Sequence, residues 1–340
     1  MGLGKGKEAL FYDQLPDGAA HCRLCPRLCT VREGGNGFCR VRKNTGGILV
    51  TENYGRLSSA ALDPIEKKPL YHFYPGHYIL SLGTLGCNLR CGFCQNWQIA
   101  HRDAPTRYLA PEEAVRMARR CGDSDHPNVG IAYTYSEPLI WYEYVRDTAR
   151  LAREAGLKNV LVTNGYIERE PLLELVPLID AMNVDVKGFT DQYYRGSCSG
   201  RLGPVLRTVE LVHGRCHLEL TTLLVTGLND DPGDIGRMVD WVAGIDPAIP
   251  LHFSRYHPDF EFDRPATPLE VMERARQTAQ ARLHYVYLGN VGEANDTVCP
   301  SCGARLIGRK GYRTEAGGLA GGACAKCGRT ADVVGDARSS

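Results

Sequence analysis

Residues 78–94 read Tyr-Ile-Leu-Ser-Leu-Gly-Thr-Leu-Gly-Cys-Asn-Leu-Arg-Cys-Gly-Phe-Cys. The apolar run at the start predicts a buried strand, and a glycine-rich turn leads from it into the spacing C-x3-C-x2-C of Cys87, Cys91 and Cys94. Thiolates are soft ligands that suit iron–sulfur clusters. A four-iron cluster needs four ligands and this loop offers three, so one iron stays open to a small molecule. A partial zinc site or three unrelated thiols is the alternative.

The region from residue 78 to residue 290 alternates β-rich runs with amphipathic helical patterns. We expect strands at residues 78–83, 129–135, 159–163, 181–187, 217–225, 251–256 and 284–288. We expect helices at residues 111–120, 140–155, 171–179, 205–213, 235–243 and 268–281. Repeated β–α units predict an α/β fold, a partial or full (β/α) TIM-like barrel with its active site at the C-terminal strand ends. A flat, doubly wound sheet is the alternative.

Small cysteine-rich modules are expected on both sides of this barrel. The predicted division is a cysteine-rich N-terminal module at residues 1–77, the barrel at 78–290 and a zinc-ribbon-like module at 291–340. The chain has 14 cysteines, and most of them lie in tight groups with C-x2-C pairs, which favours metal ligation over disulfides.

Two groups of four cysteines are candidate metal sites outside the loop at residues 87–94. The C-terminal group has two C-x2-C pairs, each followed by glycine, which is typical of a structural zinc ribbon, although a rubredoxin-like iron site has the same spacing: Cys299, Cys302, Cys324 and Cys327. The N-terminal group could hold zinc or a second cluster, and we favour a structural metal: Cys22, Cys25, Cys29 and Cys39. Cys121, Cys198 and Cys216 are single and are interpreted as ordinary thiols.

Composition and charge exclude several classes of protein. The formal net charge of +1 gives no electrostatic case for nucleic acid. No apolar stretch approaches the length of about 20 residues that a membrane span needs. The start at residues 1–7 lacks the apolar core of a signal peptide, so a cytoplasmic protein is expected.

Further motifs stand at the ends of the expected strands. Thr134-Tyr-Ser-Glu-Pro138 follows the second strand, Thr163-Asn-Gly165 the third and Asp185-Val-Lys187 the fourth. Together with the cysteine loop and Phe93 before its last cysteine, these motifs resemble the signature of the radical S-adenosylmethionine (radical SAM) superfamily. The resemblance implies a 4Fe–4S cluster and S-adenosylmethionine, which the cluster cleaves to a 5′-deoxyadenosyl radical that abstracts hydrogen from a substrate.

The resemblance also implies which residues contact S-adenosylmethionine. They lie in the cysteine loop and at the strand ends: Phe93, Ser136, Glu137, Asn164, Asp185, Lys187 and His257. The match is partial, because Tyr135 and Ser136 replace the two glycines of the family's Gly-Gly-Glu-Pro element, and Val162 replaces an acidic residue.

Each of these assignments has a structural alternative. Phe93 could pack in the core, Glu137 could begin a helix, and Asp185 with Lys187 could form an ion pair. His252, Arg255 and Tyr256 are candidates for handling the substrate, but a lone histidine is as often structural.

Several stretches together are similar to one subfamily, the radical SAM member of the AmmeMemoRadiSam system, related to pyruvate formate-lyase activating enzymes. They are the segment at 22–29, Cys94-Gln-Asn96, the motif at 134–138, His252-Phe-Ser-Arg-Tyr-His-Pro258 and the tail from residue 286. The resemblance implies a protein or small-molecule substrate, Memo-like and AMMECR-like partners, and flavodoxin or ferredoxin as electron donor. The alternatives are a glycyl-radical enzyme activase and a non-enzymatic metal- or RNA-binding protein.

Overall fold

The structure is a computed structural model that describes residues 6–292 and 294–340. Its centre is an eight-stranded sheet in the order β16-β15-β14-β13-β12-β11-β9-β8. Seven of these strands are parallel: β9 (Tyr78–Gly83), β11 (Asn128–Tyr133), β12 (Lys158–Thr163), β13 (Ala181–Asp185), β14 (His217–Leu224), β15 (Leu251–Arg255) and β16 (Val286–Gly289). The predicted parallel sheet is therefore confirmed, and each expected strand lies within two residues of its observed start.

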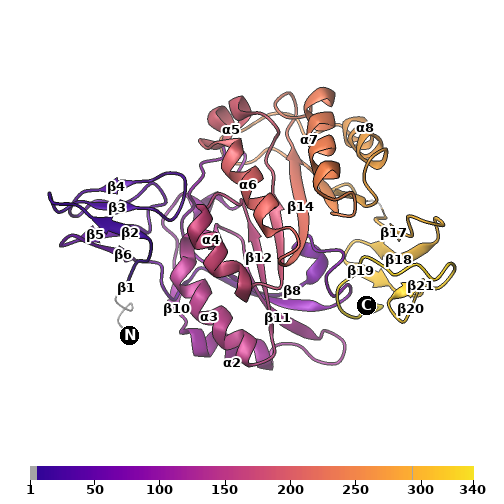
Figure 1. The fold of residues 1–340 in the computed structure, drawn as a ribbon, viewed down its shortest axis with the longest axis horizontal. Helices are drawn as coiled ribbons and strands as arrows, with labels where there is room; N and C mark the ends of the chain where they lie inside the picture. The colour runs from indigo at the N-terminus through magenta and orange to yellow at the C-terminus, as the bar shows by residue number, and fades with distance from the viewer. Residues whose placement is uncertain (1–5, 293) are drawn as a thin grey trace.

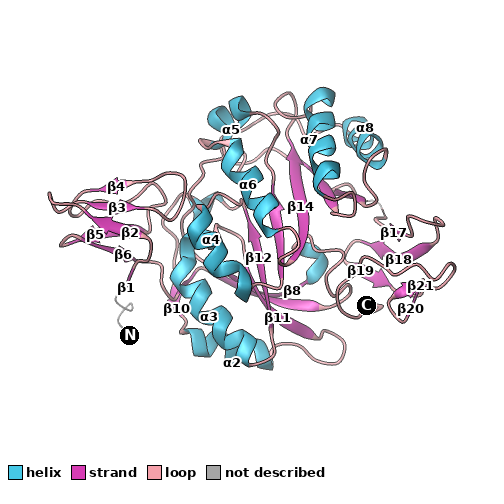
Figure 2. Cartoon of the chain, in the orientation of Figure 1, coloured by secondary structure: helices cyan, strands magenta, loops and turns pink. Residues whose placement is uncertain are grey.

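The strand order identifies the architecture as a barrel that does not close. Strands that follow each other along the chain are neighbours in the sheet. The strand order therefore never reverses, whereas a doubly wound sheet requires one reversal. Right-handed crossovers in one direction place the connecting helices on one face, as Figure 2 shows. These helices are α2 (Pro111–Arg120), α3 (Tyr142–Glu154), α4 (Arg169–Leu175), α6 (Leu202–Val212), α7 (Pro232–Ile245) and α8 (Leu269–Gln280).

Local sequence explains where these helices begin. Pro111 is the first residue of α2, where a missing N–H costs nothing, and Glu112 and Glu113 follow at the positive helix end. In α7 the side chain of Asp231 accepts hydrogen bonds from the backbone N–H groups of Gly233 and Asp234 at 2.9 and 3.0 Å. Short 3-10 turns extend two helices, η2 (Pro138–Trp141) before α3 and η3 (Val176–Leu178) after α4.

Several elements of the central domain were not expected from the sequence. Strand β8 (Ser59–Pro64) pairs antiparallel with β9 over six residues and leads into the 3-10 turn η1 (Ile65–Lys67), so the sheet begins before the boundary expected at residue 78. Helix α5 (Asp191–Cys198) precedes α6 and is capped by Thr190, whose hydroxyl accepts from the N–H of Tyr193 at 3.1 Å. A short helix, α1 (Trp97–Ala100), follows the cysteine loop.

The N-terminal module consists of short strands beside the barrel (Figure 1). One sheet has the order β1 (Lys7–Glu8), β6 (Ile48–Thr51), β5 (Arg42–Thr45), and the other has the order β2 (Tyr12–Gln14), β3 (Ala20–Cys22), β4 (Thr30–Val31). Strand β7 (Arg56–Leu57) pairs with β10 (Arg107–Tyr108). A fully buried ion pair of 2.5 Å between Arg42 and Glu143 joins this module to α3.

The C-terminal module contains the sheet β17 (Thr297–Val298), β18 (Arg305–Lys310), β19 (Arg313–Glu315) and the pair β20 (Leu319–Ala320), β21 (Ala323–Cys324). Its buried Arg309 donates to the hydroxyl of Thr297 at 2.6 Å and to the carbonyl of Tyr71 at 2.5 Å. The Arg309 Nε lies 3.8 Å from the carboxylate of Glu66. The module is thereby attached to the segment that follows β8.

The tail of the chain reinforces this attachment. The N–H of Val334 donates to the carbonyl of His72 at 2.7 Å, and the imidazole of His72 lies 2.6 Å from the carbonyl of Asp332. The segment around residues 71–73 and the tail therefore close the base of the barrel together.

A carboxylate at the base of the barrel is saturated by hydrogen bonds. Glu219 of β14 is fully buried and accepts from the backbone N–H groups of Tyr71 and His72 at 3.0 and 2.7 Å. The imidazoles of His217 and His252 lie 2.9 and 2.6 Å from its two oxygens. These bonds fix the chain segment that fills the base and leave the opposite, C-terminal ends of the strands for a site.

Among the described residues, no helix is long and apolar enough to cross a membrane. Residues 1–5 of the start, which contributed to the expected cytoplasmic location, lie outside the described part of the chain.

Candidate functional site

The cysteine loop follows β9 and lies at the C-terminal edge of the sheet, as a barrel requires. Cys91 is buried, and Cys87 and Cys94 are half-buried. The backbone N–H of Leu89 donates to the sulfur of Cys87 at 3.4 Å, and that of Asn96 lies near the sulfur of Cys94 and favours its thiolate form. Hydrogen bonds of this kind stabilise thiolates, so the loop fits an iron–sulfur cluster.

The end of α5 holds this loop from the opposite side. The N–H groups of Arg90 and Gly92 donate to the carbonyls of Cys198 and Ser197 at 2.9 and 3.1 Å. The nearby thiol of Cys198, together with burial, raises the pKa of Cys91. The sequence analysis interpreted Cys198 as an ordinary thiol, because nothing in its spacing relates it to Cys91.

Asn164 connects the end of β12 to the cysteine loop. Its amide nitrogen lies 3.6 Å from the sulfur of Cys87 and 3.0 Å from the side-chain oxygen of Asn88. Its side-chain oxygen accepts from the N–H of Tyr166 at 2.9 Å. The structure therefore brings this predicted residue to the first cluster cysteine, and its contact with S-adenosylmethionine stays a prediction.

Glu137 joins the ends of β11 and β12. Its Oε1 accepts from the hydroxyl of Thr163 at 2.6 Å and from the N–H of Leu139 at 2.9 Å, and its Oε2 accepts from the N–H of Asn164 at 2.9 Å. The bond to Leu139 is the helix-start role considered above. Oε2 accepts one bond from the described residues, so it keeps an acceptor direction free. Burial raises the pKa of Glu137 to about 7.

Asp185 and Lys187 form an ion pair of 2.7 Å at the end of β13. Burial alone would lower the pKa of Lys187, but the carboxylate of Asp185 and the nearby thiol of Cys91 raise it above its ordinary value. Two residues apart on a strand, these side chains share one face. They bring a positive charge and an acceptor next to the cysteine loop, which suits a zwitterionic ligand as well as a structural pair.

Phe93 and Ser136 make contacts within the protein. The Phe93 ring is buried, stacks on Tyr193 with ring centres 6.2 Å apart and is tilted against Phe262 at 5.9 Å. The hydroxyl of Ser136 donates to the carbonyl of Thr84 at 2.8 Å. These contacts fix the two ends of the cysteine loop region, and the adenine and S-adenosylmethionine contacts stay predictions.

A buried polar group beside Ser136 was missed by the sequence analysis. Tyr135 has the left-handed φ of 71°, which is costly for a residue with a side chain. Its hydroxyl donates to Asp63 of β8 at 2.6 Å, and Lys68 donates to the same carboxylate at 2.6 Å. Burial lowers the pKa of Lys68 to about 8. Tyr135 and Asp63 are 72 residues apart, and only the unexpected pairing of β8 brings them together, so no sequence spacing relates these two.

The histidine motif after β15 is divided between several environments. His252 is buried against Glu219 and Tyr71 at the base. Arg255 donates to the carbonyl of Thr267 at 2.7 Å, and the hydroxyl of the buried Tyr256 donates to a carbonyl in the following loop. These contacts favour structural roles for the three residues. His257 is exposed. Their predicted contacts with substrate or nucleoside stay predictions.

The four C-terminal cysteines meet at one point. All four sulfurs lie within 4.8 Å of one another, with Cys299 to Cys327 and Cys302 to Cys324 at 3.7 Å. Tetrahedral Zn–S bonds of about 2.3 Å place sulfurs about 3.8 Å apart. The predicted group of four ligands is therefore present, and its spacing is that of a single ion.

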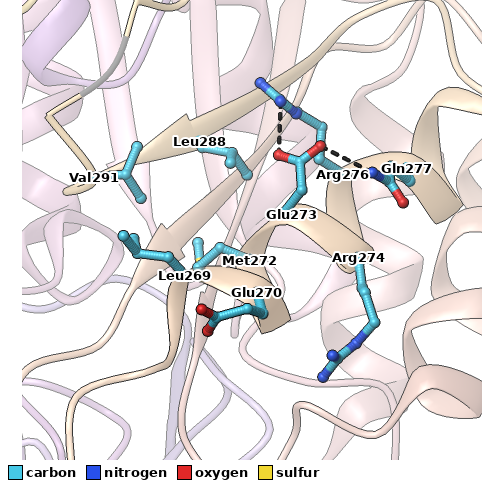
Figure 3. A pocket seen from close by; sticks show the side chains of 9 residues that line it. All are labelled: Leu269, Glu270, Met272, Glu273, Arg274, Arg276, Gln277, Leu288 and Val291. Carbon is cyan, nitrogen blue, oxygen red and sulfur yellow. Dashed lines mark hydrogen bonds and ion pairs between the residues drawn. The ribbon is translucent and has the colours of Figure 1, made fainter.

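A hollow in the surface lies away from all these residues. It has a volume of about 540 Å³ and lies between α8 and the segment after β16, lined by Leu269, Met272 and Val291 among others (Figure 3). Glu273 at its rim pairs with Arg276 at 2.6 Å. None of the predicted site residues lines it, so it is not the site built around the cysteine loop.

The chain is similar to several known proteins. The model of the Radical SAM superfamily matches residues 82–242. An uncharacterised protein of Methanocaldococcus jannaschii, MJ0808, is 44% identical over 339 residues, covering 96% of this chain and 99% of that protein. The pyruvate formate-lyase 1-activating enzyme of Escherichia coli is 22% identical over 178 residues, covering 51% of this chain and 71% of the enzyme. In fold, Streptococcus suis SuiB bound to the precursor peptide SuiA is similar, with a TM-score of 0.50, 13% identity and coverage of 66% of this chain and 51% of that one.

Proposed function

Because the chain belongs to the radical SAM superfamily, we propose that it cleaves S-adenosylmethionine reductively to generate a 5′-deoxyadenosyl radical that abstracts hydrogen from a protein or small-molecule substrate. Cys87, Cys91 and Cys94 would hold the 4Fe–4S cluster that supplies this chemistry. The observation that carries the proposal is the convergence of Asn164 and the Asp185–Lys187 pair on the cysteine loop.

The chain's own residues would orient the nucleotide beside the loop. Lys187 offers a cation to the methionine carboxylate, and Asp185 and the free direction of Glu137 offer acceptors to its ammonium group. Phe93 offers an aromatic face to the adenine. Each of these groups is already held in place by the protein, so binding costs little side-chain entropy.

The substrate is proposed from similarity alone. The resemblance to pyruvate formate-lyase activating enzymes supports glycyl-radical activation as the second candidate. The first candidate is a substrate within an AmmeMemoRadiSam system, with Memo-like and AMMECR-like proteins as partners. We place the reaction in the cytoplasm, with flavodoxin or ferredoxin as electron donor, and propose that the C-terminal cysteines hold structural zinc.

Product analysis under anaerobic conditions tests the activity. Protein reconstituted with iron and sulfide is mixed with dithionite and S-adenosylmethionine, and 5′-deoxyadenosine is measured by mass spectrometry. The native protein and the control Cys216→Ala should form it, whereas Cys91→Ala should not. Absence of the product from the native protein, or its formation by Cys91→Ala, would refute the proposal.

A second measurement separates the two candidate substrates. Each candidate partner is added to the reduced enzyme, and the partner is then searched for a modified residue by mass spectrometry and for a glycyl doublet by EPR. A doublet identifies an activase, and a modified Memo-like or AMMECR-like protein without a doublet supports the first candidate.

A further inference from the structure

Backbone N–H groups and a guanidinium lie close to the sulfurs of the N-terminal cysteines. The N–H of Arg27 near Cys25, and those of Val41 and Arg42 near Cys39, favour the thiolate forms of these two cysteines. The N–H of Phe38 lies 3.5 Å from the sulfur of Cys29, and the guanidinium of Arg42 lies 3.9 Å from the sulfur of Cys22. The sulfurs of Cys22 and Cys29 thus have a hydrogen-bond donor each, and those of Cys25 and Cys39 have backbone N–H groups nearby.

The same pattern distinguishes the other ligand cysteines of this chain from its isolated thiols. In the cysteine loop and the C-terminal ribbon, an N–H two residues after the cysteine donates to the sulfur of Cys87 and lies near those of Cys94, Cys299 and Cys324. For Cys121 and Cys216 the described residues supply no such N–H group. Cys25 and Cys39 therefore share this feature with cysteines of the two other groups.

The guanidinium of Arg42 adds a second observation. It is buried, and its Nε has no hydrogen-bond partner among the described residues. Its charge is paired with the buried carboxylate of Glu143 at 2.5 Å, so towards Cys22 the guanidinium acts as a hydrogen-bond donor to the sulfur.

Spacing favours a cluster over a single ion at this position. Of the candidate ligand groups in the described residues, the C-terminal one alone has all sulfurs within 4.8 Å, so the N-terminal sulfurs stand farther apart than one zinc ion requires. Three of the four ligands lie within the eight residues 22–29, in the spacing C-x2-C-x3-C. Structural zinc sites usually take their ligands as two separate pairs, whereas the cluster loop at residues 87–94 has the same two spacings in reverse order.

This module lies directly against the cysteine loop of the barrel. The carbonyl oxygen of Cys39 is so close to Gly86, the residue before Cys87, that a Cβ on this glycine would lie 2.5 Å from it. Arg27, between Cys25 and Cys29, donates to the carbonyl of Asn88 at 2.8 Å. Backbone of each cysteine group therefore contacts backbone of the other.

The outer surface of the module suits an acidic protein. Apart from the buried Arg42, residues 22–43 carry five basic side chains and one acidic side chain. Leu28 and Phe38, beside Cys29 and Cys39, are 44% and 41% exposed, and the guanidinium of Arg27 lies 3.7 Å from the centre of the Phe38 ring. An apolar spot within a basic rim is a contact surface for an acidic partner.

We propose that Cys22, Cys25, Cys29 and Cys39 hold a second, fully ligated 4Fe–4S cluster that passes single electrons to the cluster held by Cys87, Cys91 and Cys94. The electrons come one at a time from a reduced acidic flavin or iron–sulfur protein, which is oxidised by one electron for each one delivered. The presence of the second cluster is independent of the proposed function, whereas its role as a relay rests on it.

Iron content tests the second cluster. After anaerobic reconstitution, the native protein and Cys216→Ala should contain about eight iron atoms and eight sulfides per chain, and Cys25→Ser/Cys29→Ser about four of each. The converse variant, Cys91→Ala/Cys94→Ala, leaves the N-terminal module intact. It should retain about four iron atoms and give a cluster EPR signal on reduction.

Two results would overturn the assignment of a cluster. One is a Cys91→Ala/Cys94→Ala protein that binds no iron under these conditions. The other is zinc in place of iron at the N-terminal site, which would appear as about two zinc ions per native chain.

Reductant dependence tests the relay. With reduced flavodoxin, Cys25→Ser/Cys29→Ser should lose most of its rate of 5′-deoxyadenosine formation, whereas dithionite, a small diffusible reductant, should still support the reaction. An unchanged flavodoxin-driven rate would overturn the relay. If the proposed function itself is wrong, the result is different. The native protein then forms no 5′-deoxyadenosine with either reductant, although its iron content is intact.

Discussion

Replacing Gly86 by alanine should disrupt the contact between the N-terminal module and the cysteine loop. Gly86 has a φ of +90°, a conformation that residues with a side chain rarely adopt. An added Cβ would lie 2.5 Å from the carbonyl oxygen of Cys39 and 2.8 Å from a methyl group of Val41. Both atoms belong to the module that holds the N-terminal cysteines, so one side of the contact has to move.

The expected loss of stability has two parts. The left-handed backbone costs about 1–2 kcal/mol once a side chain is present. Forcing a methyl group into a packed contact costs about 1–3 kcal/mol more. Gly86→Ala should therefore lower the free energy of unfolding by about 2–5 kcal/mol.

Gly214→Ala is the matched control for this variant. Gly214, after α6, has a similar left-handed φ of +73°, but no atom outside its own neighbours lies within 4 Å of an added Cβ. Only the backbone cost of about 1–2 kcal/mol should appear there. Melting temperatures and iron contents of both variants and the native protein are compared under anaerobic conditions. Equal losses of melting temperature in the two variants would refute the reasoning, because they would show that the Cys39 contact costs nothing to break.

Three further predictions concern the ribbon and the base of the barrel. Cys302→Ser should release the metal of the C-terminal ribbon, seen as loss of about one zinc ion per chain, and unchanged zinc would contradict the site. Burial lowers the pKa of His72 from 6.5 to about 4, so its neutral form contributes about 3 kcal/mol of stability above pH 6.5, and this contribution is lost as the pH falls towards 4. In melts from pH 7.5 to 4, His72→Gln should show a weaker dependence of stability on pH than the native protein. Parallel curves of stability against pH for the two proteins would count against this prediction. Burial raises the pKa of Glu66 to about 7, so its carboxyl can take up a proton when Arg309→Met removes the neighbouring positive charge. The destabilisation due to the lost charge pair should therefore reach only about 1.4 kcal/mol at pH 8 and vanish near pH 6. Denaturation at both pH values checks this, and a loss of stability that does not change with pH would contradict it.

The parallel sheet was predictable because its strands are continuous apolar runs between helical patterns. Residues 78–83 and 111–120 form the expected strand and helix with the same bounds. Strand β8 escaped prediction because Ser59-Ala-Ala-Leu-Asp-Pro64 has neither an apolar run nor a clear alternation. Helix α5 escaped because Tyr, Ser and Gly form helices weakly, and its start depends on the cap by Thr190.

The candidate site was predictable where ligands follow one another in the sequence. The C-terminal four cysteines have a diagnostic spacing, and the structure brings them together. The partners of Glu137 and of Tyr135 were not predictable, because Asp63 and Thr163 approach them only through the pairing of strands. The same holds for Arg42 and Glu143, which lie 101 residues apart in the sequence.

The closure of the barrel base by the tail has a consequence for the order of folding. His72 and Asp332 are separated by 260 residues, whereas the strands of the barrel pair with their neighbours along the chain. Loops of that length close slowly, since chain entropy has to be overcome before the contact yields any gain. The sheet and its helices should assemble first, while water still has access to the base of the barrel. The C-terminal ribbon should then dock and exclude the remaining water from the base.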